Sequence, residues 1–229
     1  MLTLAVDIGG GTIKLLALGP QGEAATETLS QPTPNPAKPD AVCNLVRDMA
    51  ATLPPFQRVS VGFPGIVKES VTINAPNLGN ELWSRVPLGA QLSRDLERPV
   101  RVVNDVDLQG LGVVRGRGVE LVLTLGTGMG AALFTEGVLV PNLELGHHPF
   151  RDGNTYEDLV RDTELKRIGK VEWTARVMNA FEQLEPIFNY DMLHIGGGNA
   201  QNIEAKLPDN VRVFTLAEAL RGAPKLWND

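Results

Sequence analysis

Two aspartates follow short apolar runs, at places where a strand would end. Asp7 precedes the glycines Gly9, Gly10 and Gly11, and Asp105 begins a segment whose apolar residues have helical spacing. A carboxylate beside glycine N–H groups that no side chain covers suits a phosphate oxygen and its Mg²⁺. An aspartate at the carboxyl end of a strand can accept a proton from a bound hydroxyl. Each residue also has a plainer interpretation, as part of a structural glycine turn or as the N-cap of a helix.

A third group of polar residues lies in the second half of the chain. Glu144 and His147 stand three residues apart in LELGHHPF, and Glu157 follows at the start of a helical pattern. Carboxylate and imidazole groups can hold vicinal hydroxyls by hydrogen bonds. His147 and His148 could instead bind a metal, but three histidines and one cysteine leave too few ligands for a closed structural zinc site. We therefore expect no structural zinc.

Strands and glycine turns position these residues. Leu2–Val6 and Thr12–Leu18 read as a buried hairpin, and Gly9–Gly11 between them permit the positive φ values of a tight turn. Glu120–Phe134 repeats strand, glycine turn and strand around Gly126, Thr127 and Gly128. Met192–Ile195 is a third strand, and Gly196–Gly198 opens a helix at Asn199, where a nucleotide could approach closely. The repeated unit predicts two similar lobes.

Other segments connect and cover these elements. Gln31–Pro39 has four prolines and predicts an extended surface connection, after which a helix begins with Asp40 as its N-cap and ends before Pro54. Asn74–Trp83 predicts a long loop that could bind hydroxyls or simply cover the surface. The remaining predicted elements are a strand, turn and strand at Gly62–Val67, a strand at Pro99–Asn104, a helix at Asp105–Val114, helices over Thr163–Phe188 and a short helix at Thr215–Leu220.

Composition excludes several classes of protein. The chain has 229 residues, is 43% hydrophobic and 21% charged, and carries a net charge of −6. This acidic balance argues against a nucleic-acid or membrane partner, since both select an excess of lysine and arginine. Cys43 is the only cysteine, and its apolar helical setting predicts an inert buried thiol. No apolar run is long enough for a signal peptide or a membrane span, so we expect a cytoplasmic protein.

The glycine turns match neither common nucleotide motif, because no GK[ST] follows a glycine loop and no GxGxxG stands between a strand and a helix. Five motifs instead resemble the ROK family of sugar kinases, within the actin-like ATPase and hexokinase superfamily. They are DIGGGTIK from Asp7, VNDVD from Val103, LTLGTGMG from Leu123, ELGHHP from Glu144 and IGGGNA from Ile195. Within the family the chain is most similar to the polyphosphate glucokinases, which share LVPN with ELGH, the TxE helix, GGGNA and a terminal KLW.

The resemblance implies a phosphotransferase that acts on a hydroxyl of glucose or a related hexose, most simply the 6-hydroxyl, with polyphosphate or ATP as donor and Mg²⁺ as cofactor. Asp105 would be the general base. The sugar would be held by Gly65, Asn104, Glu144, His147 and Glu157. The phosphates and nucleotide would lie near Asp7, Gly9, Gly10, Gly11, Thr12, Lys14, Gly126, Thr127, Gly128, Gly197 and Gly198. Asp7 would reach Mg²⁺ through water.

The resemblance also implies a two-lobed α/β fold of ribonuclease-H-like topology, with mixed sheets flanked by helices. We expect lobes at residues 1–105 and 106–229, a hinge near Asn104–Val114, and a homodimer. Gly11 stands where the family has Ser or Thr, and Val106 replaces a small alanine. Two alternatives remain, a sugar-sensing regulator of the same family and an actin-like ATPase. The sequence leaves open which hexose and which donor are used.

Overall fold

The structure is a computed structural model that describes residues 1–228. It divides into two compact units, one formed by Met1–Gly112 with the segment from Ala217 onward, and one formed by Val113–Leu216. This division differs from the lobes expected at 1–105 and 106–229. The chain leaves the first unit after Gly112, and its last residues return to that unit.

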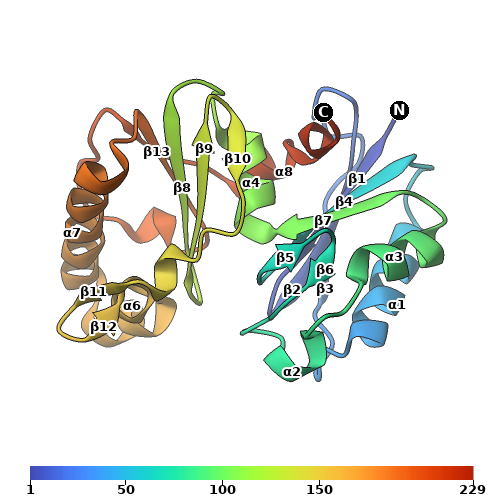
Figure 1. The fold of residues 1–229 in the computed structure, drawn as a ribbon, viewed down its shortest axis with the longest axis horizontal. Helices are drawn as coiled ribbons and strands as arrows, with labels where there is room; N and C mark the ends of the chain where they lie inside the picture. The colour runs from blue at the N-terminus through green and yellow to red at the C-terminus, as the bar shows by residue number, and fades with distance from the viewer. Residues whose placement is uncertain (229) are drawn as a thin grey trace. The chain divides into compact units, whose positions relative to one another are not determined.

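The first unit is built on a five-stranded sheet in the order β3-β2-β1-β4-β7 (Figure 1). The strands are β1 Thr3–Ile8, β2 Thr12–Leu18, β3 Leu29–Pro32, β4 Arg58–Phe63 and β7 Val100–Asn104. β1 pairs antiparallel with β2 and parallel with β4, and β4 pairs parallel with β7. The helices are α1 Pro39–Ala50, α2 Asn80–Trp83, α3 Leu88–Leu96, α4 Asp105–Val113 and α8 Leu216–Leu220, and the small hairpin is β5 Val67–Lys68 with β6 Val71–Thr72.

Helix α1 shows how the apolar pattern fixes the core of this unit. Val42, Cys43, Val46 and Met49 are buried, and their three-and-four spacing places them on one face of the helix. Burial raises the pKa of the Cys43 thiol to about 12, which fits the inert thiol that we predicted. The prediction that Asp40 is the N-cap was wrong. The helix begins two residues earlier because proline suits its first position, so Lys38 is the N-cap.

The glycine turn between β1 and β2 differs from the prediction in one respect. None of Gly9, Gly10 and Gly11 has a φ in the left-handed range, so the turn does not use the positive φ values that its glycines permit. Close approach explains two of these glycines instead. A Cβ at Gly9 would lie 2.9 Å from the Thr12 carbonyl oxygen, and one at Gly10 would lie 3.2 Å from Asn77 Cβ.

The second unit repeats this architecture with the sheet order β10-β9-β8-β13-β14. Its strands are β8 Val119–Leu125, β9 Met129–Thr135, β10 Val138–Val140, β13 Met192–Gly196 and β14 Val211–Val213. Its helices are α5 Tyr156–Val160, α6 Asp162–Ile168 and α7 Lys170–Phe188, with a short hairpin of β11 Pro149–Arg151 and β12 Asn154–Thr155. Both sheets run antiparallel, antiparallel, parallel and parallel along their order. The predicted α/β fold with two ribonuclease-H-like lobes is confirmed.

A buried hydrogen bond between a carboxylate and an imidazole links β8 and β13 near the start of the second unit. Glu120 on β8 is 1% exposed, and its carboxylate lies 2.8 Å from Nε2 of His194 on β13. The same carboxylate accepts hydrogen bonds from the N–H groups of Arg115 and Gly116, at 2.8 and 2.7 Å. Burial raises the pKa of the Glu120 carboxyl, but the Arg115 N–H, His194 and the Gly116 N–H outweigh it, so the pKa lies below its usual value. Burial lowers the pKa of His194, which Glu120 offsets only in part, so the imidazole is neutral and donates from Nε2.

We expect the Glu120→Gln substitution to lower the free energy of unfolding by about 2 kcal/mol at pH 7.5, because it removes the charge from several buried hydrogen bonds. A carboxyl whose folded pKa is depressed stabilises the protein above its unfolded pKa and loses this effect as the pH falls through the folded value. The difference from the wild type should therefore be full at neutral pH and should shrink as the pH falls below the usual glutamate pKa of about 4.3. Urea unfolding across this pH range, with the exposed Glu182→Gln as control, measures it. A difference that stays constant down to the lowest pH at which both proteins still fold would contradict the assignment.

The C-terminal segment packs on the first sheet through its last tryptophan. Trp227 ends the 3-10 helix η3, Ala223–Trp227, and the guanidinium carbons of Arg58 and Arg101 lie 5.5 and 4.6 Å from the centroid of its ring. Trp227 Nε1 donates to Ser60 Oγ at 2.9 Å, and the buried Ser60 hydroxyl donates to the Ala223 carbonyl at 2.7 Å. These contacts explain why the chain returns to the first unit instead of staying with the second.

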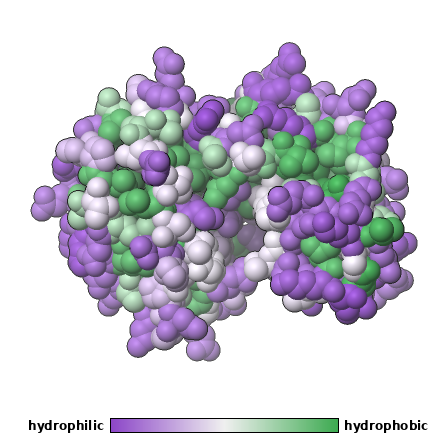
Figure 2. All heavy atoms as spheres, turned by 180° about the vertical axis from the view of Figure 1, so that it is seen from behind, coloured by the Kyte–Doolittle hydropathy of each residue, from purple (hydrophilic) through white to green (hydrophobic). Residues whose placement is uncertain are grey.

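One face of the protein carries mostly hydrophilic side chains. On the face drawn in Figure 2, hydrophilic residues are interspersed with smaller apolar areas. Within residues 1–228, no helix is both long enough and apolar enough to cross a membrane.

Candidate functional site

In the first unit, three parallel strands bring the predicted residues to one edge of the sheet. Asp7 on β1 pairs with Gly62 on β4, and Gly62 pairs with Val103 on β7. Parallel strands end at a common edge, so Asp7 and Asn104 both lie near this edge, followed by the glycine turn and by α4. Gly62 is needed here, because a Cβ would lie 3.2 Å from Asp105 Cα.

Asn104 connects two of the predicted sugar-binding positions. Its side-chain oxygen accepts hydrogen bonds from the N–H groups of Val106 and Asp107, at 2.8 and 3.2 Å, so Asn104 caps α4. Its side-chain nitrogen donates to the Gly65 carbonyl at 3.2 Å. The cap of α4 is therefore supplied by the residue before Asp105, whose half-buried carboxylate is held by the Val106 N–H at 2.8 Å. Asp105 is thus fixed at a strand end without being the main helix cap.

Thr33 fixes the carbonyl groups of the glycine turn. Its hydroxyl donates to the Gly9 carbonyl at 2.6 Å, and its N–H donates to the Gly11 carbonyl at 3.0 Å. Sequence reasoning missed Thr33, because the proline-rich segment around it predicted only a surface connection. The sequence did offer one signal for Thr33. It is a polar residue beside prolines, in a segment that follows the hairpin and has to pass near its glycine turn.

Asp7 is the residue of this edge best suited to a cation. It is 8% exposed, and burial raises the pKa of its carboxyl, an effect that Lys14 partly offsets from 3.9 Å across the hairpin. No cluster of three metal-binding side chains occurs within residues 1–228. One carboxylate beside open backbone N–H groups fits Mg²⁺, which keeps several waters and takes its other ligands from phosphate.

In the second unit, two glycine stretches lie together at the corresponding edge. β8 and β13 are parallel and end at Leu125 and Gly196. A Cβ at Gly197 would clash with the Leu125 carbonyl, and the Asn199 N–H donates to this carbonyl at 3.0 Å. The Asp162 N–H at the start of α6 donates to the Gly126 carbonyl at 2.8 Å. The structure therefore places Gly126–Gly128 beside Gly197 and Gly198.

The helix predicted to begin at Asn199 was wrong. The segment forms only a single 3-10 turn, Ala200–Asn202. The side-chain nitrogen of Asn199 lies 3.5 Å from both the Gly126 carbonyl and an Asp162 carboxylate oxygen, so Asn199 braces the glycine turn and does not start a helix. Asp162 and Asn199 are bracing residues that sequence reasoning missed, because their partners are far away in the chain.

The predicted carboxylates and histidine of the second unit surround the same turn. A Glu157 carboxylate oxygen accepts a hydrogen bond from the Met129 N–H at 3.0 Å, directly after Gly128. Gly146 lies so close to the Met129 carbonyl that a Cβ there would clash, which holds Glu144 and His147 near β9. His147 Nε2 lies 3.5 Å from a Glu144 carboxylate oxygen. Burial raises the pKa of Glu144, His147 opposes this effect, and the nearby Glu157 adds to it.

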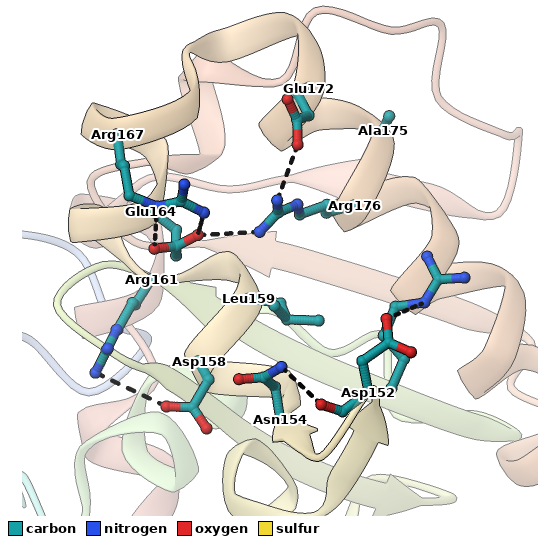
Figure 3. A pocket seen from close by; sticks show the side chains of 11 residues that line it. Asp152, Asn154, Asp158, Leu159, Arg161, Glu164, Arg167, Glu172, Ala175 and Arg176 are labelled. Atoms are coloured by element: carbon teal, nitrogen blue, oxygen red, sulfur yellow. Dashed lines mark hydrogen bonds and ion pairs between the residues drawn. The ribbon is translucent and has the colours of Figure 1, made fainter.

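A cavity of about 660 Å³ lies entirely within the second unit and is lined by residues from Arg151 to Arg176, including residues of α5, α6 and α7 (Figure 3). Four arginines line it, namely Arg151, Arg161, Arg167 and Arg176, together with four carboxylates, Asp152, Asp158, Glu164 and Glu172. Glu164 pairs with Arg167 and Arg176 at 2.6 and 3.0 Å, and Arg176 also reaches Glu172 at 2.8 Å. The cavity is rich in charge but balanced in sign.

The segment Asn74–Trp83 proved more ordered than the predicted loop. Its end is the short helix α2, and Trp83 is fully buried against Phe63, with ring centroids 4.8 Å apart. The Asn74 and Asn80 side chains accept hydrogen bonds from the N–H groups of Ile66 and Ala75, at 2.8 and 3.0 Å. These two amides therefore shape the segment itself.

Comparison with known proteins agrees with these arrangements. Residues 3–154 match the model of the ROK family. Polyphosphate glucokinase of Mycobacterium tuberculosis (strain ATCC 25177 / H37Ra) is 27% identical over 216 residues, which cover 89% of this chain and 80% of that protein. The crystal structure of inorganic polyphosphate/ATP-glucomannokinase from Arthrobacter sp. strain KM is 30% identical, covers 98% of both chains and has a TM-score of 0.86. A ROK family glucokinase from Streptomyces griseus, in complex with glucose and AMPPNP, has the same fold, with 19% identity, 99% coverage of both chains and a TM-score of 0.78. The chain belongs to the ROK family.

Proposed function

We propose that this protein is a sugar kinase that transfers a phosphoryl group from ATP or polyphosphate to a hydroxyl of glucose or a related hexose. The observation that carries the proposal is the parallel-strand edge of the first unit, where Asp7, the glycine turn, Asn104 and Asp105 gather. The names of the similar proteins support it, since these are a polyphosphate glucokinase and a polyphosphate/ATP-glucomannokinase.

In this mechanism the chain positions its reactants and balances their charge, which is most of what phosphoryl transfer requires. Asn104 and Gly65 would hold the sugar, and Asp105 would accept the proton of the attacking hydroxyl. Glu144, His147 and Glu157 would bind other sugar hydroxyls from the second unit. The N–H groups near Gly10, Gly11 and Gly126–Gly128 would bind phosphate oxygens. Mg²⁺, held by Asp7 through water, would neutralise phosphate charge.

The donor preference follows from the charge of the arginine-lined cavity. A long polyphosphate needs an excess of cations along its path, and this attraction weakens with salt. The four arginines of the cavity are matched by four carboxylates, so little net attraction remains. We therefore expect ATP to serve at least as well as polyphosphate.

The test is a panel of sugars assayed with ATP and with polyphosphate, followed by kcat/KM for both donors at low and high salt. We expect glucose phosphorylation with both donors, and a kcat/KM for polyphosphate that does not exceed the value for ATP. A polyphosphate rate far above that of ATP, and insensitive to salt, would refute the charge argument. Absence of transfer to every sugar with either donor would refute the proposed function.

A further inference from the structure

One peptide group of the first unit is held at both ends by asparagine side chains. It joins Gly65 to Ile66, shortly after β4 ends. Its N–H donates to the Asn74 side-chain oxygen at 2.8 Å, and its carbonyl accepts a hydrogen bond from the Asn104 side-chain nitrogen at 3.2 Å. Because a peptide group is planar and rigid, turning one end also turns the other. The two asparagines, which are far apart in the sequence, are therefore linked through one rigid group.

Asn74 is itself held where it meets this peptide group. The Ile73 N–H beside it donates to the Ile66 carbonyl at 2.8 Å, and Gly65 lies so close that a Cβ there would clash with the Asn74 carbonyl. Residues 63–65 are buried and Asn74 is half-buried. A hydrogen bond that is shielded from water is electrostatically stronger than one in water. The Asn74 oxygen can therefore fix the orientation of the peptide group.

At its other end the link reaches the proposed base. The Asn104 side-chain oxygen and a carboxylate oxygen of Asp105 both accept the Val106 N–H, each at 2.8 Å. The first N–H groups of a helix have no partner within it, so the Asn104 oxygen sets how α4 begins. The Asn104 amide is planar, so the bond from its nitrogen to Gly65 also decides where its oxygen lies. A rotation of this amide would move the N–H that orients the Asp105 carboxylate.

The contacts form one continuous chain of amide groups. The Val106 N–H donates to the Asn104 amide, this amide donates to the Gly65–Ile66 peptide group, and the peptide group donates to the Asn74 amide. Amides that accept at oxygen and donate from nitrogen in series polarise one another, so each bond strengthens the next. Removal of the last acceptor therefore weakens the bonds that lie closer to Asp105.

We propose that Asn74 is a positioning residue for Asp105, and that it acts through the Gly65–Ile66 peptide group and the Asn104 side chain. Asn74 takes no part in proton transfer itself. The inference rests on the proposed function, in which Asp105 accepts the proton of the attacking hydroxyl. It gives Asn74 a role beyond shaping its own segment.

The first test compares the kinetics of Asn74→Ala and Asn74→Asp with those of Asn80→Ala. Asn80 is a matched control, because its side-chain oxygen also accepts a backbone N–H of this segment, from Ala75 at 3.0 Å, and within residues 1–228 it makes no bond to the Gly65–Ile66 peptide group. We expect Asn74→Ala to lower kcat about tenfold or more and to leave the KM for ATP unchanged, since a small misplacement of a reacting group is costly. Asn74→Asp keeps an acceptor oxygen and should recover most of kcat. Asn80→Ala should keep the kcat of the wild type.

A double-mutant cycle with Asn104→Ala tests the link itself. Asn104→Ala interrupts the chain between the peptide group and Asp105. Adding Asn74→Ala in that background should lower kcat by less than about twofold, because residues of one network are not additive. Losses that simply multiply would overturn the inference. Equal losses in Asn74→Ala and Asn80→Ala, or in Asn74→Ala and Asn74→Asp, would also overturn it.

A measurement without turnover separates this inference from the proposed function. The Val106 and Asp107 N–H groups begin α4 and are bonded to the Asn104 oxygen. Their hydrogen exchange, followed by NMR, should be about threefold faster or more in Asn74→Ala than in Asn80→Ala, while β13 of the second unit exchanges alike in both. If the wild type phosphorylates no sugar but this difference is found, the proposed function fails and the link stands. If glucose is phosphorylated and the two variants behave alike in exchange and in kcat, the link fails and the proposed function stands.

Discussion

The Asp105→Asn variant is expected to bind glucose normally and to lose at least ~100-fold in kcat, the usual scale for removing a positioned base. The amide has the same shape, and its oxygen can still accept the Val106 N–H that holds Asp105 at 2.8 Å. Asn104 keeps its cap of α4 and its bond to Gly65. Only the capacity to accept the hydroxyl proton is removed.

Steady-state kinetics with saturating ATP, together with glucose binding by calorimetry, measure this effect. Asp48→Asn on the exposed surface of α1 is the matched control and should keep full activity. A folded Asp105→Asn enzyme with turnover near that of the wild type would move the base to another residue.

Replacing Glu157 by alanine is expected to raise the KM for glucose about tenfold or more, because the partner hydroxyl is left unsatisfied at a cost of about 1–3 kcal/mol. The structure adds a second role for this residue. Its carboxylate also accepts the Met129 N–H beside Gly128, so the alanine variant loosens the second glycine turn as well.

Glu157→Gln separates the two roles. Its amide oxygen can still accept the Met129 N–H, whereas its charge is gone. We expect Glu157→Gln to keep the donor KM of the wild type and to raise the glucose KM by less than the alanine variant. Glu182→Ala on the exposed side of α7 is the control. Unchanged glucose KM in both Glu157 variants would place the sugar elsewhere.

Much of the fold was predictable because its signals are local. Leu2–Val6 and Thr12–Leu18 flank the glycines Gly9–Gly11, a pattern that specifies a hairpin, and the pairing of Asp7 with Lys14 confirms it. Helix α1 carries its apolar face in its own sequence. The repeat of this pattern at Glu120–Phe134 was enough to predict two similar units.

The parts of the candidate site that escaped prediction depend on distant partners. Thr33 matters only because the chain folds it beside Gly9 and Gly11, and Asn199 only because it meets Asp162 and the Gly126 carbonyl. Spacing within a short segment carries no information on such contacts. The glycine φ values were missed for a related reason. A glycine can be required because a neighbour lies too close for a Cβ, as Asn77 does at Gly10, or because φ is positive. The sequence alone does not show which of these two reasons applies.

Because the C-terminal segment returns to the first unit, the two units receive their last residues in a fixed order during synthesis. The second unit is one continuous stretch, Val113–Leu216, so all of its residues have been made before the first unit has all of its own. The unit that begins first is finished last, because the buried Ser60 hydroxyl and the ring of Trp227 meet only when the final residues have been made. We therefore expect loss of the segment from Ala217 onward to destabilise the first unit, which holds Asp7 and Asp105, more than the continuous stretch Val113–Leu216.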